Sequence, residues 1–175
     1  MNFESVLNLL VRNFQEWKID YAVIGGIALA FLGHPRTTQD IDFLVEKKDL
    51  FQLKKLMSSL GFKCEFESED VVTFIGQLTG LGRIDFLLAH RQHTQDMLKR
   101  VKVLNEIKVV MPEDLIGLKV QSLANDPERY HQDLADIEVL LKDGGLDLDI
   151  VRKYFKIFKK ESELDQMLER IKDAK

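Results

Sequence analysis

The segment over residues 22–45 constrains the fold of this chain more than any other. It reads A-V-I-G-G-I-A-L-A-F-L-G-H-P-R-T-T-Q-D-I-D-F-L-V. A short apolar run over 19–24 ends abruptly at Gly25-Gly26, which predicts a strand and a tight turn, and 27–32 then has helical character. Alternation begins again at Asp40 and predicts a second strand over 40–45, with Asp40 and Asp42 on one face.

The remaining hydrophobic pattern predicts an α+β fold in two parts. A mixed sheet with helices packed on it is expected over 1–111, and from Pro112 onward the periodicity is helical only, which predicts a helical C-terminal region over 112–175. The expected helices are 3–17, 48–60, 94–100, 113–124, 128–142, 147–159 and 162–173. The further expected strands are 62–66, 71–78, 83–89 and 107–111.

Composition excludes several classes of protein. The 175 residues are 45% hydrophobic and 31% charged, as in ordinary globular proteins. No stretch has the roughly 18–20 apolar residues that span a bilayer, and the start M-N-F-E-S lacks the basic residues of a secretory signal, so we expect a cytoplasmic protein with no membrane partner. The net charge of −4 argues against a general nucleic-acid coat. A single cysteine, Cys64, excludes an internal disulfide, and we expect it to be buried on a strand.

Acidic residues in the predicted strands indicate a cation site. Two carboxylates as close as those of Asp40 and Asp42 repel each other unless a cation or a proton lies between them, and such oxygen ligands suit Mg²⁺. Asp85 interrupts another apolar strand and supplies a third acid. Gly25 and Gly26 permit close approach of the backbone, and N–H groups at a helix start attract anions. Together these features predict a site for a nucleoside triphosphate with two metal ions.

Two common phosphate-binding motifs are missing from the sequence. No G-K-[ST] follows a glycine loop, and the spacing G-x-G-x-x-G does not occur. The chain is therefore neither a P-loop protein nor a protein with the dinucleotide-binding fingerprint.

The paired glycines followed by Asp-x-Asp resemble the signature of the DNA polymerase β-type nucleotidyltransferase superfamily. The fuller pattern G-G-x-A-L…R-x-T-x-D-I-D resembles more narrowly the AbiEii-like branch, which is known for toxins of bacterial toxin–antitoxin and abortive-infection systems. Two later strings also resemble that branch: P-E-D-L-I-G-L-K, which ends at Lys119, and H-Q-D-L-A-D-I, which contains Asp133 and Asp136. The resemblance implies a nucleotidyltransferase core over 1–111.

For the metal site, the resemblance implies that Asp40, Asp42 and Asp85 bind Mg²⁺. Asp85 would also help to deprotonate the attacking hydroxyl group. Lys119 would neutralise charge on the triphosphate.

For the nucleotide, the resemblance implies that Gly25 and Gly26 hold the triphosphate. Arg36 and Thr38 match the R-x-T positions, where they support the site or touch a phosphate. Asp133 and Asp136 are expected near the nucleotide or as residues that order its pocket.

The implied activity is Mg²⁺-dependent nucleotidyl transfer from a nucleoside triphosphate to an acceptor hydroxyl group. The toxin-like resemblance indicates RNA, such as a tRNA end, or a protein side chain as acceptor. Two alternatives remain open: a non-catalytic nucleotide- or partner-binding module on the same scaffold, and an enzyme that modifies a small molecule such as an antibiotic.

Local periodicity offers simpler interpretations of the later residues. It favours a solvated Lys119, and it allows Asp133 and Asp136 to be surface charges beside Arg129. A cationic strip in the helix predicted over 147–159 and just beyond it either contacts a phosphate backbone or is a solvated face. The strip contains Arg152, Lys153, Lys156, Lys159 and Lys160.

Overall fold

The computed structural model describes residues 2–173. These residues form two compact units that divide between Val110 and Met111, called here the N-terminal unit and the C-terminal unit. The first contains a sheet and four α-helices, and the second contains α-helices. The predicted α+β fold class is confirmed.

The N-terminal unit is built on a mixed sheet of seven strands in the order β3-β4-β5-β2-β1-β7-β6. The central pair β2–β5 is parallel, as is β1–β7, and the other neighbouring pairs are antiparallel. The strands are β1 (Tyr21–Ile24), β2 (Asp40–Glu46), β3 (Phe62–Glu67), β4 (Val71–Gly76), β5 (Arg83–Ala89), β6 (Lys102–Leu104) and β7 (Ile107–Val109).

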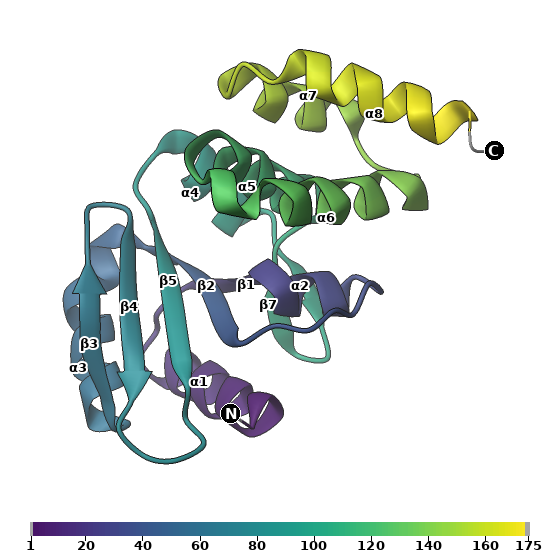
Figure 1. Cartoon of the computed structure of the whole chain (residues 1–175). Coiled ribbons are helices and arrows are strands. Elements are labelled where there is room, and N and C mark those ends of the chain that lie inside the picture. The colour runs from purple at the N-terminus through teal and green to yellow at the C-terminus, as the bar shows by residue number, and fades with distance from the viewer. Residues whose placement is uncertain (1, 174–175) are drawn as a thin grey trace. The chain divides into compact units, whose positions relative to one another are not determined.

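Helices α1 and α3 lie on one face of this sheet, behind β3, β4 and β5 in Figure 1. Phe14 of α1 meets Phe43 of β2 edge to face at 5.2 Å between ring centroids, and Phe43 stacks on Phe86 of β5 at 5.5 Å. Burying these rings on the helix side turns the alternate residues Asp42 and Asp85 to the other face. The helices are α1 (Phe3–Glu16), α2 (Gly25–Phe31), α3 (Leu50–Ser59, after a 3₁₀ turn at Lys47–Asp49) and α4 (Gln92–Lys99).

The C-terminal unit contains α5 (Pro112–Asn125), α6 (Tyr130–Asp143, after a 3₁₀ turn at Pro127–Arg129), α7 (Leu148–Ile157) and α8 (Glu161–Asp173). Helix α5 packs against both α6 and α7. Gly117 permits the contact with α7, because a Cβ atom there would lie 2.7 Å from the ring of Tyr154. The Tyr154 hydroxyl donates to Asp114 Oδ1 at 2.6 Å, which satisfies a buried carboxylate oxygen.

Two sequence-based expectations are wrong in detail, and one strand was not expected. Helix α2 begins at Gly25, so the glycine pair forms its first turn and does not precede it. The short strand β6 was not predicted. Cys64 is exposed, because β3 is an edge strand whose residues after Phe62 are open to solvent.

Candidate active site

The parallel pairing of β2 with β5 brings three aspartates together. Asp42 pairs directly with Asp85, and Asp40 pairs with Arg83. One carboxylate oxygen from each of Asp40, Asp42 and Asp85 lies within 4.8 Å of the other two. All three side chains are partly exposed, so the cluster is open to a ligand.

Two neighbouring residues orient the carboxylate of Asp85. The buried hydroxyl of Thr73 on β4 donates to Asp85 Oδ1, and Arg83 Nε donates to Asp85 Oδ2 at 2.8 Å. The hydrogen bond to Asp85 is the largest of the effects that raise the pKa of Arg83. Neither residue was expected at the site from the sequence, although Arg83 is a charge two positions before Asp85 on the same strand face.

The glycine pair lies directly against the carboxylate of Asp42. Ile24 pairs with Asp42 across β1 and β2, and Gly25 follows with a φ of +64°. A Cβ atom on Gly25 would lie 2.0 Å from Asp42 Oδ2. Only glycine fits this position, because the approach leaves no room for a side chain and the backbone angle disfavours one.

Arg36 and Thr38 line the same corner of the N-terminal unit. Thr38 Oγ1 donates to Asp40 Oδ1 at 2.9 Å, which orients that carboxylate. A Cβ atom on Gly26 would lie 2.9 Å from Thr38 Cβ and 3.4 Å from Arg36 Nη1. The structure therefore gathers both glycines, Arg36 and Thr38 around the aspartate cluster.

This donor set fits a divalent cation. Carboxylate oxygens are hard ligands, and three of them within 4.8 Å repel one another unless positive charge lies between them. The cluster is typical of metal-dependent nucleotidyltransferases.

The other predicted site residues form a second cluster inside the C-terminal unit. Lys119 Nζ lies 2.8 Å from Asp133 Oδ1 and 2.6 Å from Asp136 Oδ2. Lys119 is only 4% exposed and Asp133 is fully buried, with Arg129 Nε 3.8 Å from Asp133 Oδ2. The solvated interpretation of these residues is therefore wrong, since α5 is packed by helices on more than one side.

A model of the family described as "Nucleotidyl transferase AbiEii toxin, Type IV TA system" matches residues 8–174. This span includes both clusters. The chain belongs to this family. It is accordingly a nucleotidyltransferase family enzyme, and a nucleoside triphosphate substrate is implied. A search of curated proteins gives no match.

Solved structures share the fold of this AbiEii family member at low sequence identity. The solution structure of the antibiotic-resistance factor ANT(2'')-Ia is 14% identical, with a TM-score of 0.66 over 97% of this chain and 99% of that one. The lincomycin-bound lincosamide antibiotic adenylyltransferase LnuA is 14% identical, with a TM-score of 0.58 over 79% and 96%. An antigenic nucleotidyltransferase-like protein from Paracoccidioides brasiliensis is 18% identical, with a TM-score of 0.57 over 96% and 92%.

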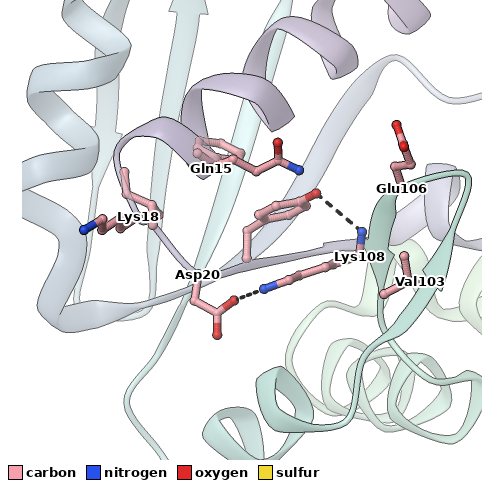
Figure 2. A pocket seen from close by; sticks show the side chains of 9 residues that line it. Gln15, Lys18, Asp20, Val103, Glu106 and Lys108 are labelled. Atoms are coloured by element: carbon pink, nitrogen blue, oxygen red, sulfur yellow. Dashed lines mark hydrogen bonds and ion pairs between the residues drawn. The ribbon is translucent and has the colours of Figure 1, made fainter.

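This chain also has a cleft of about 380 Å³ near Tyr21, the first residue of β1 (Figure 2). The ammonium group of Lys108 forms an ion pair with Asp20 in this cleft, and the backbone N–H of Lys108 donates to the Tyr21 hydroxyl at 3.4 Å. Burial raises the pKa of Tyr21. The cleft is separate from the aspartate cluster, because Asp42 pairs with Ile24 at the opposite end of the strand. Within residues 2–173, no helix is long and apolar enough to cross a membrane.

Proposed function

We propose that this chain transfers a nucleoside monophosphate from a nucleoside triphosphate to an acceptor hydroxyl group with Mg²⁺ as the metal. The observation that carries the proposal is the convergence of three carboxylates from two paired strands. The acceptor is RNA, such as tRNA, or a protein side chain. The reaction takes place in the cytoplasm, where nucleoside triphosphates are available.

In this mechanism Asp40, Asp42 and Asp85 hold the metal ions. Bound Mg²⁺ would neutralise charge on the phosphates and stabilise the attacking and leaving oxygens of an in-line displacement. Asp85 also accepts the proton of the attacking hydroxyl. Thr73 and Arg83 would fix the orientation of its carboxylate during this step.

The triphosphate lies on the side of Gly25 and Gly26 in this proposal. The carboxylate of Asp42 and the side chain of Thr38 fill the space that side chains would take at the two glycines, so the glycines let these residues pack against the turn beside which the phosphates would lie. Arg36, whose guanidinium lies beside Gly26, contributes positive charge, and Thr38 keeps Asp40 oriented through its hydrogen bond.

The family resemblance supports a nucleotide-binding role for the cluster in the C-terminal unit. Lys119 would neutralise negative charge on the triphosphate. Asp133 and Asp136 would order its ammonium group through the two short contacts already described.

Replacing a metal ligand tests the proposal. Asp42→Asn keeps the size of the side chain and removes its charge, so label transfer from an α-³²P nucleoside triphosphate to cellular RNA or protein should fall at least about 100-fold. Asp96→Asn on α4 is the matched control, because Asp96 is not part of the aspartate cluster and accepts hydrogen bonds from Gln92 and Lys99 of its own helix. Undiminished transfer by the Asp42 variant would refute the assignment.

Membership of a toxin family supports a toxin activity that depends on this transfer. Induced expression of the wild-type chain should then arrest bacterial growth, and expression of Asp42→Asn should not.

A second candidate acceptor is a small molecule such as an antibiotic. The fold shared with ANT(2'')-Ia and LnuA supports this alternative. Aminoglycosides and lincosamides offered with each of the four nucleoside triphosphates would test it, and a labelled antibiotic would favour it over RNA or protein.

A further inference from the structure

Phe66 is an exposed aromatic residue on the edge strand β3, with 55% of its surface accessible. It pairs with Thr73 on β4, Thr73 pairs with Asp85, and Asp85 pairs with Asp42. Directly paired residues on neighbouring strands project from the same face of a sheet. Phe66 therefore continues the cross-strand row of the aspartates, and strand spacing places its Cα about 10 Å from that of Asp85.

A bulge in β3 lies on the same face of the sheet as the aspartates. The register shifts between Cys64 and Phe66, so Glu65 is the additional residue. Glu65 Oε2 lies 3.9 Å from Arg83 Nη1, and Arg83 in turn holds Asp85. This chain of contacts places the bulge on the aspartate face independently of the strand register. Helices α1 and α3 lie on the other face (Figure 1).

The row formed by Asp42, Asp85, Thr73 and Phe66 extends toward the side from which an acceptor would approach. In an in-line displacement the attacking hydroxyl and the leaving pyrophosphate lie on opposite sides of the reacting phosphorus. Gly25 lies on the β1 side of Asp42, whereas Thr73 and Phe66 lie on the β4–β3 side of Asp85. If the triphosphate occupies the glycine side, as the proposed function requires, the acceptor approaches from the side of β3.

We propose that Phe66 is the platform on which the terminal nucleobase of a nucleic-acid acceptor stacks. A phenyl ring has no hydrogen-bonding group, so it recognises the flat face of a base and not its identity. The proposal rests on the proposed function, because that function defines which side of the aspartates the acceptor occupies.

Charges around Phe66 are compatible with a phosphate backbone. The flanking acids are paired, Glu65 with Arg83 and Glu67 with Lys54. Lys63 pairs in register with Ile75, and Ile75 with Arg83, so the exposed Lys63 lies on the same face as the aspartates. Lys63 thus offers positive charge on the face that carries the ring, which suits a phosphate backbone.

A stacking probe tests the proposal without any transfer step. The probe is a short single-stranded oligoribonucleotide whose 3′-terminal base is 2-aminopurine, because the fluorescence of this base falls when it stacks. Titration with the full chain, in the absence of a nucleoside triphosphate, should quench the probe. Phe66→Ala should weaken binding about tenfold and remove the quenching, whereas Phe66→Trp should retain both.

The matched control is Phe51→Ala on α3. Phe51 is also exposed, at 70%, and Lys55 Nζ lies 4.3 Å from the centroid of its ring. Because α3 lies on the other face of the sheet, loss of this exposed aromatic residue should leave probe binding unchanged. An oligonucleotide with an abasic 3′ end should bind the wild-type chain as weakly as the normal probe binds Phe66→Ala. The proposal is overturned if the wild-type chain does not bind the probe, if Phe66→Ala binds it equally well, or if the abasic strand binds equally tightly. Each of these results leaves the transfer assay on Asp42→Asn unaffected.

Discussion

Gly25 and Asp42 are packed so closely that position 25 has no room for a side chain. In Gly25→Ala, the new methyl group would meet Asp42 Oδ2 at 2.0 Å, and alanine at a φ of +64° costs about 1–2 kcal/mol of backbone strain. The carboxylate must move to relieve the clash, so we expect nucleotidyl transfer to be nearly abolished and the melting temperature to fall by a few degrees. Label transfer and thermal unfolding measure the two effects.

Gly145→Ala separates the effect of the steric clash with Asp42 from the effect of backbone strain. Gly145 has a similar φ of +72°, but a Cβ atom there would meet nothing within 4 Å. This variant should incur the backbone penalty and keep full transfer activity. Normal transfer by Gly25→Ala would show that the position of the Asp42 carboxylate is not required.

Thr73 positions a proposed metal ligand through one buried hydrogen bond. Thr73→Val keeps the shape of the side chain and removes the donor to Asp85 Oδ1, and loss of such a partner costs about 10–100-fold in metal affinity or activity. We expect weaker Mn²⁺ binding by calorimetry together with slower transfer, and Thr73→Ser should restore both. Equal Mn²⁺ affinity in the valine variant would contradict the positioning role.

The sequence predicts some of these residues better than others, for a physical reason. Asp40 and Asp42 were recognised because strand alternation places neighbours two apart on one face. Thr73 was missed because its role depends on which strands pair, and one sequence gives no direct signal for the pairing of β4 with β5.

Elements with long, strongly periodic patterns were predicted well, and short ones were not. Strand β6 has three residues and joins β7 through Asn105 and Glu106, both of which have positive φ. A two-residue hairpin turn of this kind normally contains Asn-Gly, so a sequence with Glu106 in the second position does not indicate a hairpin. Helix α2 was predicted to begin two residues late because glycine usually marks a turn, although here its function is close approach to Asp42.

Asp70 links the start of β4 to the end of β5. Its carboxylate contacts His90 Nε2 at 2.6 Å and Arg91 Nη2 at 2.9 Å. The hydrogen bond with His90 is the largest cause of the lowered pKa of Asp70. A carboxyl group with a lowered folded pKa stabilises the fold above its unfolded pKa of about 3.9, and this contribution is lost as the pH falls through the folded value.

Asp70→Asn should therefore lower the melting temperature at about pH 5, and the difference from the wild-type chain should shrink as the pH falls below the ordinary carboxyl pKa of about 3.9. The effect will be small, since the Asp70 side chain is 39% exposed. Asp173→Asn, at the exposed end of α8, makes the same charge change and should show no comparable pH dependence. A pH-independent difference for Asp70→Asn would contradict the ion-pair explanation.

Across the whole molecule, the two units have different interiors. The N-terminal unit is organised around an aromatic cluster that includes Phe14, Phe43 and Phe86. The C-terminal unit buries an ammonium group between two carboxylates. The periodicity of α5 alone favoured a solvated Lys119, because a single-helix pattern does not reveal that two other helices pack against α5.

Lys119→Met tests how far the C-terminal unit depends on this ion cluster. The variant keeps much of the side-chain volume but leaves Asp133 and Asp136 buried without their shared cation, which typically costs about 3–5 kcal/mol. Denaturant unfolding should show this loss, whereas the exposed Lys142→Met on α6 should change stability by less than about 0.5 kcal/mol. If Lys119→Met impaired nucleotide binding and left stability unchanged, the ion cluster would serve the ligand alone. A large loss of stability would mean that Lys119 also holds the helices together. In that case any nucleotide that Lys119 contacts must compete with Asp133 and Asp136 for its ammonium group.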